Sequence, residues 1–284
     1  MTAWLERRVV AFAHQGGSFE GPSSTLWAME RALRAGASAL ELDVHATRDR
    51  HLVVVHDATV ERTTAGTGVI SEMTLAELRQ LDNAYWWIEG EDVSPGREPG
   101  AYPLRGRAPA DRRLGVVTLD EVLEAFPGVL LNLDLKGTDP EVEPYEDLLA
   151  QTLRAHGAAS RVIVASFHDR ALERFRRLAP EVATSAGTEE ATAFYLAHLS
   201  GEDRPWPFVA LQVPAEHEGI EVVTVGFVDA AHRAGVAVHV WTLNERAAML
   251  AALEAGVDGV ISDRPSVLAA LLAERGESWD GLGR

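Results

Sequence analysis

The chain has 284 residues, no cysteine and a formal net charge of −17 at pH 7. The acidic balance argues against nucleic-acid binding, which needs a basic surface, and the lack of cysteine excludes disulfides, cysteine-ligated zinc and a cysteine nucleophile. No signal peptide is expected at Met1 to Arg8 and no apolar run is long enough to span a bilayer, so we expect a cytoplasmic protein without a transmembrane segment.

Apolar runs typical of buried strands alternate with segments of helical periodicity along the whole chain. Strands are predicted at residues 8–13, 39–44, 53–56, 129–135, 161–167, 182–186, 208–213, 236–241 and 259–263. Helices are predicted from residue 26 to the glycine at 36 and over 74–78, 119–126, 143–156, 169–178, 188–198, 226–234, 245–255 and 265–273. This alternation predicts an α/β fold, an irregular (β/α)8 TIM barrel in one domain over residues 1–284. An open doubly wound sheet is the alternative, although no glycine-rich phosphate fingerprint is present.

Two segments depart from the regular alternation. The connection from Val44 to Val53 is too short for a crossover helix. The run 53–56 is therefore expected either to pair as a hairpin or to mark a place where the barrel lacks a helix, and a hairpin would explain why nine strands are predicted where a barrel needs eight. Residues 82–115 are rich in proline, glycine and aromatic residues, and we interpret them as an insertion within the barrel domain.

Ionisable residues stand at the ends of several predicted strands, where a barrel places its catalytic groups. Glu41 and Asp43 are two positions apart and therefore face the same side of a strand, and the same holds for Asp134 and Lys136. The strand ends supply His14, Glu41, Asp43, His56, Asp134, Lys136 and Trp241. The convergence of these residue types is more specific than any single motif.

Three of these residues form an all-oxygen set. Glu41, Asp43 and Asp134 suit Mg²⁺, Ca²⁺ or Mn²⁺ better than zinc. The alternative is that the three carboxylates form buried ion pairs with arginines of the barrel.

The remaining residues suggest acid–base chemistry on an anionic substrate. His14 and His56 come from different strands, and such a pair can act as general base and general acid. Lys136 is the one lysine among 26 basic residues, and its compact charge could neutralise a phosphate. Trp241 could either pack in the barrel or form a wall of the substrate site.

The order and spacing of these motifs resemble those of the glycerophosphodiester phosphodiesterases. The matching runs are AHQGG (13–17), ELDV (41–44), VVHD (54–57), ERTT (61–64), NLDLK (132–136), VWTLN (240–244) and GVDGVISD (256–263). The resemblance implies a phospholipase-C-like barrel with an insertion at 82–115 that cleaves a glycerophosphodiester to glycerol 3-phosphate and an alcohol. It also implies that His14 and His56 are the acid and base, that Glu41, Asp43 and Asp134 bind one Mg²⁺ or Ca²⁺, and that Lys136 holds phosphate.

Three positions differ from the family pattern. Gln15 replaces the usual arginine after the first histidine, so we expect a weaker phosphate contact from this side chain or a different substrate. Residues 22–25 read PSST where the family has PENT, and Asp134 is one methylene shorter than the usual glutamate.

These observations leave three hypotheses for the function. The main one is metal-dependent hydrolysis of small glycerophosphodiesters by His/His acid–base catalysis. A variant is a lysophospholipase-D-like reaction on lysolipids, with the aromatic insertion holding the acyl chain. The third, motivated by Gln15, is a phosphate-ester binding barrel without turnover. The expected partner is a small-molecule substrate, and nothing in the sequence predicts an oligomeric state.

Overall fold

The computed structural model describes residue 4, residues 9–91 and residues 93–277. Eight strands in this part form a parallel barrel. In barrel order they are β1 (Val10–His14), β2 (Ala39–Ala46), β5 (Leu130–Leu135), β6 (Val162–Ala165), β7 (Ala183–Thr184), β8 (Ala210–Pro214), β11 (Ala237–Trp241) and β12 (Gly259–Ser262). The expected absence of a signal peptide concerns residues 1–8, of which only Trp4 is described.

The barrel closes between β7 and β8. Ser185 and Ala210 form a parallel bridge, and the Val209 amide donates to the Thr184 carbonyl at 3.0 Å. Closure rules out the open doubly wound sheet, and the predicted (β/α)8 barrel is confirmed.

The ninth predicted strand lies outside the barrel. Strand β3 (Leu52–Val54) pairs antiparallel with β2, with Val44 opposite Val54, and then pairs with β4 (Val117–Thr118). The hairpin interpretation is therefore confirmed. Strand β4 and the small hairpin of β9 (Glu216–His217) and β10 (Ile220–Glu221) were not predicted, because two-residue strands are too short to show an alternating pattern.

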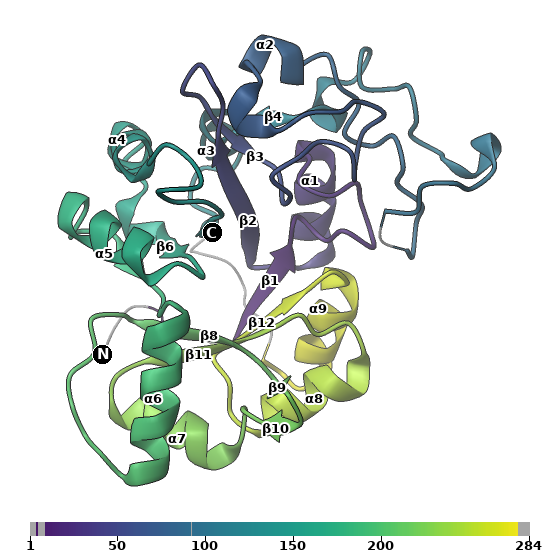
Figure 1. Cartoon of the computed structure of the whole chain (residues 1–284). Coiled ribbons are helices and arrows are strands. Elements are labelled where there is room, and N and C mark those ends of the chain that lie inside the picture. Colours follow the sequence, from purple (N-terminus) through teal and green to yellow (C-terminus); the bar gives the residue numbers. More distant parts are fainter. Residues whose placement is uncertain (1–3, 5–8, 92, 278–284) are drawn as a thin grey trace.

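Helices surround the barrel, and Figure 1 shows α4 to α9 following one another around its outside. Their starts and ends follow local sequence signals. Thr25 caps α1 by accepting from the Ala28 amide, and Gly36 ends it at φ 108°. The α-helices are α1 (Leu26–Ala35), α2 (Leu75–Leu78), α3 (Leu119–Ala125), α4 (Glu146–Ala155), α5 (Asp169–Leu178), α6 (Thr188–Ser200), α7 (Val225–Arg233), α8 (Arg246–Glu254) and α9 (Pro265–Glu274). Short 3₁₀ turns lie at Ile70–Glu72, Pro99–Ala101, Arg112–Leu114 and Ala159–Arg161.

Apolar side chains close one end of the barrel interior. They come from the beginning or middle of their strands and are almost fully buried. This layer consists of Val10, Phe12, Ala39, Leu130, Ile163, Ala210, Ala237 and Ile261, with Trp4 packed against it. Because this end is filled, a site can form only at the opposite, carboxyl end of the strands.

The segment 82–115 leaves the barrel and returns to it at one point, where Asp82 and Gly115 form an isolated bridge. It projects from the barrel at the upper right of Figure 1. Three of its aromatic residues surround the Arg105 guanidinium, which lies 3.7–4.7 Å from the ring centroids of Tyr85, Trp86 and Tyr102, and Trp87 packs on Trp27 instead. Cation–π contacts thus hold the segment together from within.

Across the described residues, no helix is long and apolar enough to cross a membrane.

Candidate active site

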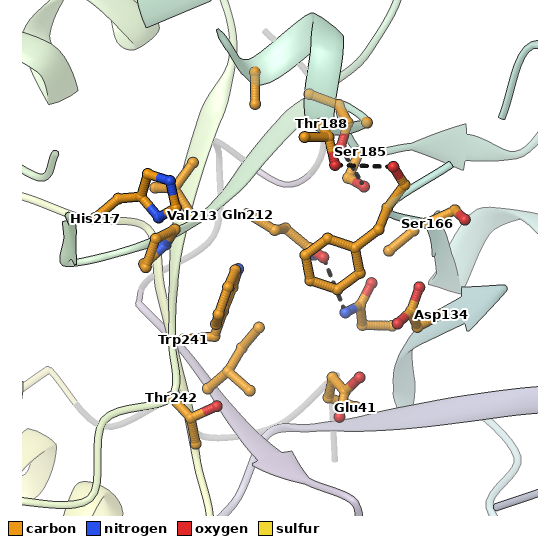
Figure 2. Close-up of a pocket in the computed structure, with 18 of the residues that line it drawn as sticks. Glu41, Asp134, Ser166, Ser185, Thr188, Gln212, Val213, His217, Trp241 and Thr242 are labelled. Atoms are coloured by element: carbon orange, nitrogen blue, oxygen red, sulfur yellow. Dashed lines mark hydrogen bonds between the residues drawn. The ribbon is translucent and has the colours of Figure 1, made fainter. Parts of the chain in front are cut away.

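A cavity of about 620 Å³ opens at the carboxyl ends of the barrel strands. The predicted site residues His14, Glu41, Asp43, His56, Asp134, Lys136 and Trp241 all line it. Figure 2 shows Glu41 and Asp134 on one side of this space, with Trp241 facing them from the other. Strand ends far apart in the sequence thus contribute to a single site, as the barrel fold requires.

His14, the last residue of β1, is held by a buried aspartate. Its Nδ1 lies 2.6 Å from Oδ1 of Asp263, directly after β12. Asp263 also accepts hydrogen bonds from Ser18 Oγ and Asn244 Nδ2, both at 2.7 Å. With Nδ1 engaged in this way, Nε2 is the nitrogen left to exchange a proton with a substrate.

His56 has the same kind of support. Its Nδ1 lies 2.6 Å from Oδ1 of Asp57, whose other oxygen accepts from Arg62 Nε at 3.0 Å. The hydrogen bond from His56 is the main reason that the pKa of Asp57 is lowered. The ring centroids of His14 and His56 are 6.2 Å apart. Two imidazoles oriented by carboxylates therefore stand next to each other in the cavity wall.

The register between β2 and β5 sets which polar side chains lie opposite each other. Asp43 of β2 is directly opposite Asp134 of β5, and Glu41 is directly opposite Asn132. Like charges in directly opposed positions of a sheet repel each other. Here the Lys136 ammonium lies 3.3 Å from Asp43 and 3.2 Å from Asp134, which offsets the repulsion. Asp43 and Asp134 are thus paired with a lysine, and Glu41 lies 3.8 Å from His14 Nε2, so the partners differ from the barrel arginines of the ion-pair alternative.

Burial and charge shift the pKa values of the site. Burial, reinforced by Asp43, raises the pKa of Glu41 to about 8, and burial also raises that of Asp134. Burial opposes protonation of His14, but its hydrogen bond to Asp263 and the nearby carboxylates raise its pKa to about 9. Several ionisable groups with strongly shifted pKa values in one cavity are typical of a functional site.

The chemistry of the carboxylates suits a hard cation. Asp43 Oδ2 and Asp134 Oδ1 are buried without a hydrogen-bond partner, which is costly for charged oxygens. Among the described residues, no three His, Asp or Glu side chains are gathered tightly enough to enclose a metal ion, and Lys136 lies against the two aspartates. The donors that Glu41, Asp43 and Asp134 offer nevertheless match the preferences of Mg²⁺ and Ca²⁺.

Gln15 is buried beside the cavity and does not line it. Its Oε1 accepts from Ser23 Oγ at 2.5 Å and from Arg62 Nη2 at 3.1 Å, and its Nε2 lies 3.3 Å from His14 Nε2. Two of the three departures from the family pattern, at positions 15 and 23, therefore contact each other. A direct contact between Gln15 and phosphate stays a prediction.

Trp241 is half-buried and lines the cavity, where its ring packs edge to face on Phe167 with centroids 5.7 Å apart.

The inserted segment does not contribute to the cavity, since none of the described residues that line this cavity comes from 82–115. The hypothesis that the aromatic insertion holds an acyl chain in the site is therefore wrong, because three of its rings contact Arg105 and Trp87 packs on Trp27.

Sequence reasoning assigned no role to the residues that support the histidines. Asp57 directly follows His56, and Asp263 ends the last predicted strand, so both were visible as acidic residues at strand ends. Arg62 belongs to the matching run at 61–64, but its partners could not be predicted, because it lies in a loop and reaches Asp57 and Gln15 only through the fold.

The fold and site together define a barrel protein with paired histidines and a carboxylate cluster at the carboxyl end of its strands. A family model, the glycerophosphoryl diester phosphodiesterase family, matches residues 14–267. A glycerophosphodiester phosphodiesterase of Caldanaerobacter subterraneus subsp. tengcongensis is 30% identical over 273 residues, covering 95% of this chain and all of the relative. The chain therefore belongs to the glycerophosphoryl diester phosphodiesterase family, a family of phosphoric diester hydrolases, and the resemblance stated above is confirmed.

Solved structures agree with this assignment. The glycerophosphoryl diester phosphodiesterase domain of a Mycobacterium tuberculosis protein superposes with a TM-score of 0.76 at 21% identity, covering 94% of this chain and 99% of the other. A phosphodiesterase of Oleispira antarctica, solved in complex with the product sn-glycerol-3-phosphate, has a TM-score of 0.71 at 25% identity and covers 96% of this chain and all of the other.

Proposed function

We propose that this protein hydrolyses glycerophosphodiesters to glycerol 3-phosphate and an alcohol by acid–base catalysis from His14 and His56. The main support is the matched pair of histidines. Each has Nδ1 on an aspartate at 2.6 Å, and both line the cavity that also holds the carboxylates and Lys136. The glycerol 3-phosphate bound to the Oleispira antarctica relative supports this choice of product.

In the proposed reaction the glycerol hydroxyl of the substrate attacks phosphorus, and water later opens the resulting cyclic phosphate. One histidine takes the proton of the attacking hydroxyl, and the other gives a proton to the leaving alcohol oxygen. In the second step the histidine that gave its proton takes one from the attacking water, and the other histidine returns its proton to the glycerol oxygen. The aspartates behind the two rings hold the tautomer and stabilise the charge that each imidazole gains, as in other carboxylate–histidine pairs.

Lys136 and the carboxylate cluster would handle the phosphate charge. Glu41, Asp43 and Asp134 would hold one Mg²⁺ or Ca²⁺, and Lys136 would pair with a phosphate oxygen. When bound, the divalent cation would stabilise the phosphate charge and lower the pKa of the attacking hydroxyl. We further propose that the substrate is a small molecule and not a nucleic acid, and that the protein is cytoplasmic.

The test measures glycerol 3-phosphate release from a panel of glycerophosphodiesters with Mg²⁺, with Ca²⁺ and with a chelator. We expect metal-dependent release, and we expect His14→Ala to lower kcat about 10²- to 10⁴-fold, as for the loss of a general acid or base. His51→Ala is the matched control, because the His51 side chain is half-exposed and does not line the cavity. Ligand binding without release under any condition would instead support the binding barrel.

A further inference from the structure

The cavity extends well beyond the histidines and carboxylates. Lining residues from position 165 onward include no Asp, Glu, Lys or Arg. Its far part is mainly apolar and is formed by the loop after β6, by α6, by the end of β8 and by the β9–β10 hairpin, with Thr188, Thr192, Gln212 and His217 as its polar members. The apolar part consists of Phe167, Ala191, Tyr195, Val213, Ile220 and Val222.

Two of these side chains are unusually exposed for their type. Phe167 is 56% exposed and Ile220 is 52% exposed, and both line the cavity. Phe167 also packs on Trp241, which faces the acidic side of the cavity (Figure 2). Apolar side chains left open to water on the wall of a pocket are typical of a ligand-binding surface.

The apolar region is continuous with the acid–base groups, so one molecule can occupy both. A cavity of about 620 Å³ is in the range that encloses ligands of drug size, which leaves space beyond a glycerol phosphate group. An ionic head group would find no carboxylate, lysine or arginine partner among the described residues of the far part, so part of its lost hydration would go uncompensated. A hydrocarbon chain would instead bury apolar surface.

We propose that this apolar region binds a hydrocarbon chain carried by the phosphodiester substrate, so that the enzyme prefers lipid-like glycerophosphodiesters over glycerophosphocholine. This inference rests on the proposed function for the position of the phosphate. The chain can be attached either to the glycerol, as in a 1-acyl lysophospholipid, or to the leaving alcohol, as in a glycerophospho-n-alkanol. The chemistry of recognition is the same for both.

The kinetic test compares two substrate series with 6 to 12 carbons, kept below their critical micelle concentrations. One series is 1-acyl lysophosphatidylcholines and the other is glycerophospho-n-alkanols. We expect kcat/KM to rise about threefold to fourfold per added methylene in at least one series until the cavity is full. The series that rises identifies which end of the substrate carries the chain, and a flat response in both would overturn the inference.

Variants locate the effect on the cavity wall. Phe167→Ser and Ile220→Ser should flatten the rise with chain length, with the largest loss for the longest chain. Leu199→Ser is the matched control, because Leu199 is 64% exposed on α6 but does not line the cavity. An unchanged chain-length slope in both cavity variants would contradict the proposal.

A binding measurement separates this inference from the proposed function. Calorimetry with n-alkylphosphocholines of increasing length should show affinity rising with the chain in the wild type and not in Phe167→Ser. Rising affinity without turnover of any substrate would refute the proposed function and keep the apolar site. Turnover of glycerophosphocholine, with affinity and kcat/KM independent of chain length, would keep the function and refute the apolar site.

Discussion

His14 and His239 lie on strands of the same barrel, yet their pKa values shift in opposite directions. His14 of β1 contacts Glu41 of β2 and Asp263, which follows β12, and its pKa rises to about 9. His239 of β11 is fully buried beside Phe12 and Gln212, contacts no carboxylate among the described residues, and has its pKa lowered to about 3 by burial. The carboxyl end of the barrel and its apolar interior thus provide opposite electrostatic environments.

The difference follows from depth, because His14 lines the cavity whereas His239 packs on Phe12 in the apolar layer that fills the barrel. The wall of β1, β2 and β5 concentrates negative charge, which favours a proton, a lysine or a metal ion. The opposite wall carries Gln212, Val213 and Trp241, which favour neutral or apolar groups. A substrate with a phosphate at one end and a hydrocarbon chain at the other would match this polarity.

The largest expected effect comes from removing charge on the acidic wall. Asp43→Asn should lower activity by at least about 100-fold, because even residues outside the first coordination shell of a metal contribute about 10- to 100-fold. In the wild type, Mg²⁺ should also raise the midpoint of thermal unfolding, since a ligand that binds only the folded state stabilises it. This rise should disappear in Asp43→Asn. Asp229→Asn, an exposed position on α7, is the control, and an equal Mg²⁺ response in all three proteins would argue against a metal at Asp43.

Removing Asp57, which holds the His56 ring, should lower kcat less than removing a catalytic histidine. Asp57→Asn removes the carboxylate that orients the His56 ring and pairs with Arg62. We expect kcat to fall about 10- to 100-fold, below the range for losing an acid–base residue, with a smaller change in KM. Steady-state kinetics on glycerophosphocholine measure both constants, and a change confined to KM would indicate that Asp57 contributes only to substrate binding.

A smaller effect is expected at the position where the chain departs from its family. Gln15→Arg would place a second guanidinium next to Arg62 and remove the oxygen that accepts from it, so we expect activity to fall about tenfold. Adding Ser23→Glu should restore much of this loss, because Ser23 already contacts the Gln15 side chain at 2.5 Å. A double-mutant cycle on kcat/KM measures the coupling, and higher activity in the single variant would mean that Gln15 weakens a phosphate site.

The smallest effect concerns stability alone. The pKa of His239 is about 3 in the folded protein and about 6.5 when the chain is unfolded, so its contribution to stability is complete above pH 6.5 and is lost as the pH falls towards 3. Between pH 6.5 and pH 5 this loss amounts to about 2 kcal/mol. His239→Met removes the titrating group, so its free energy of unfolding should fall less steeply over this range. Denaturant titrations at both pH values measure the difference, and parallel losses in the two proteins would show that His239 is not buried in neutral form.

The sequence predicted the site best for residues that lie at the ends of strands. The alternation of strands and helices predicted the barrel, and the spacing of Glu41 with Asp43 and of Asp134 with Lys136 predicted one charged wall. The hairpin at β3 was left open, because a short connection shows only that no crossover helix fits. Only the lysophospholipase-D-like variant placed the aromatic insertion in the site, and it was wrong on this point because composition does not show what a side chain contacts.

The sequence by itself determined the fold class, the family and the set of ionisable groups, because these depend on periodicity and on spacing along the chain. Only the tertiary structure decided which groups meet. Asp263 reaches His14 across 249 positions, and Arg62 reaches Gln15 across 47. The apolar part of the cavity likewise combines separate segments such as those at Phe167, Tyr195 and Ile220, none of which forms a recognisable motif. Closing a sheet into a barrel brings distant strand ends together, and no local pattern in the chain records that proximity.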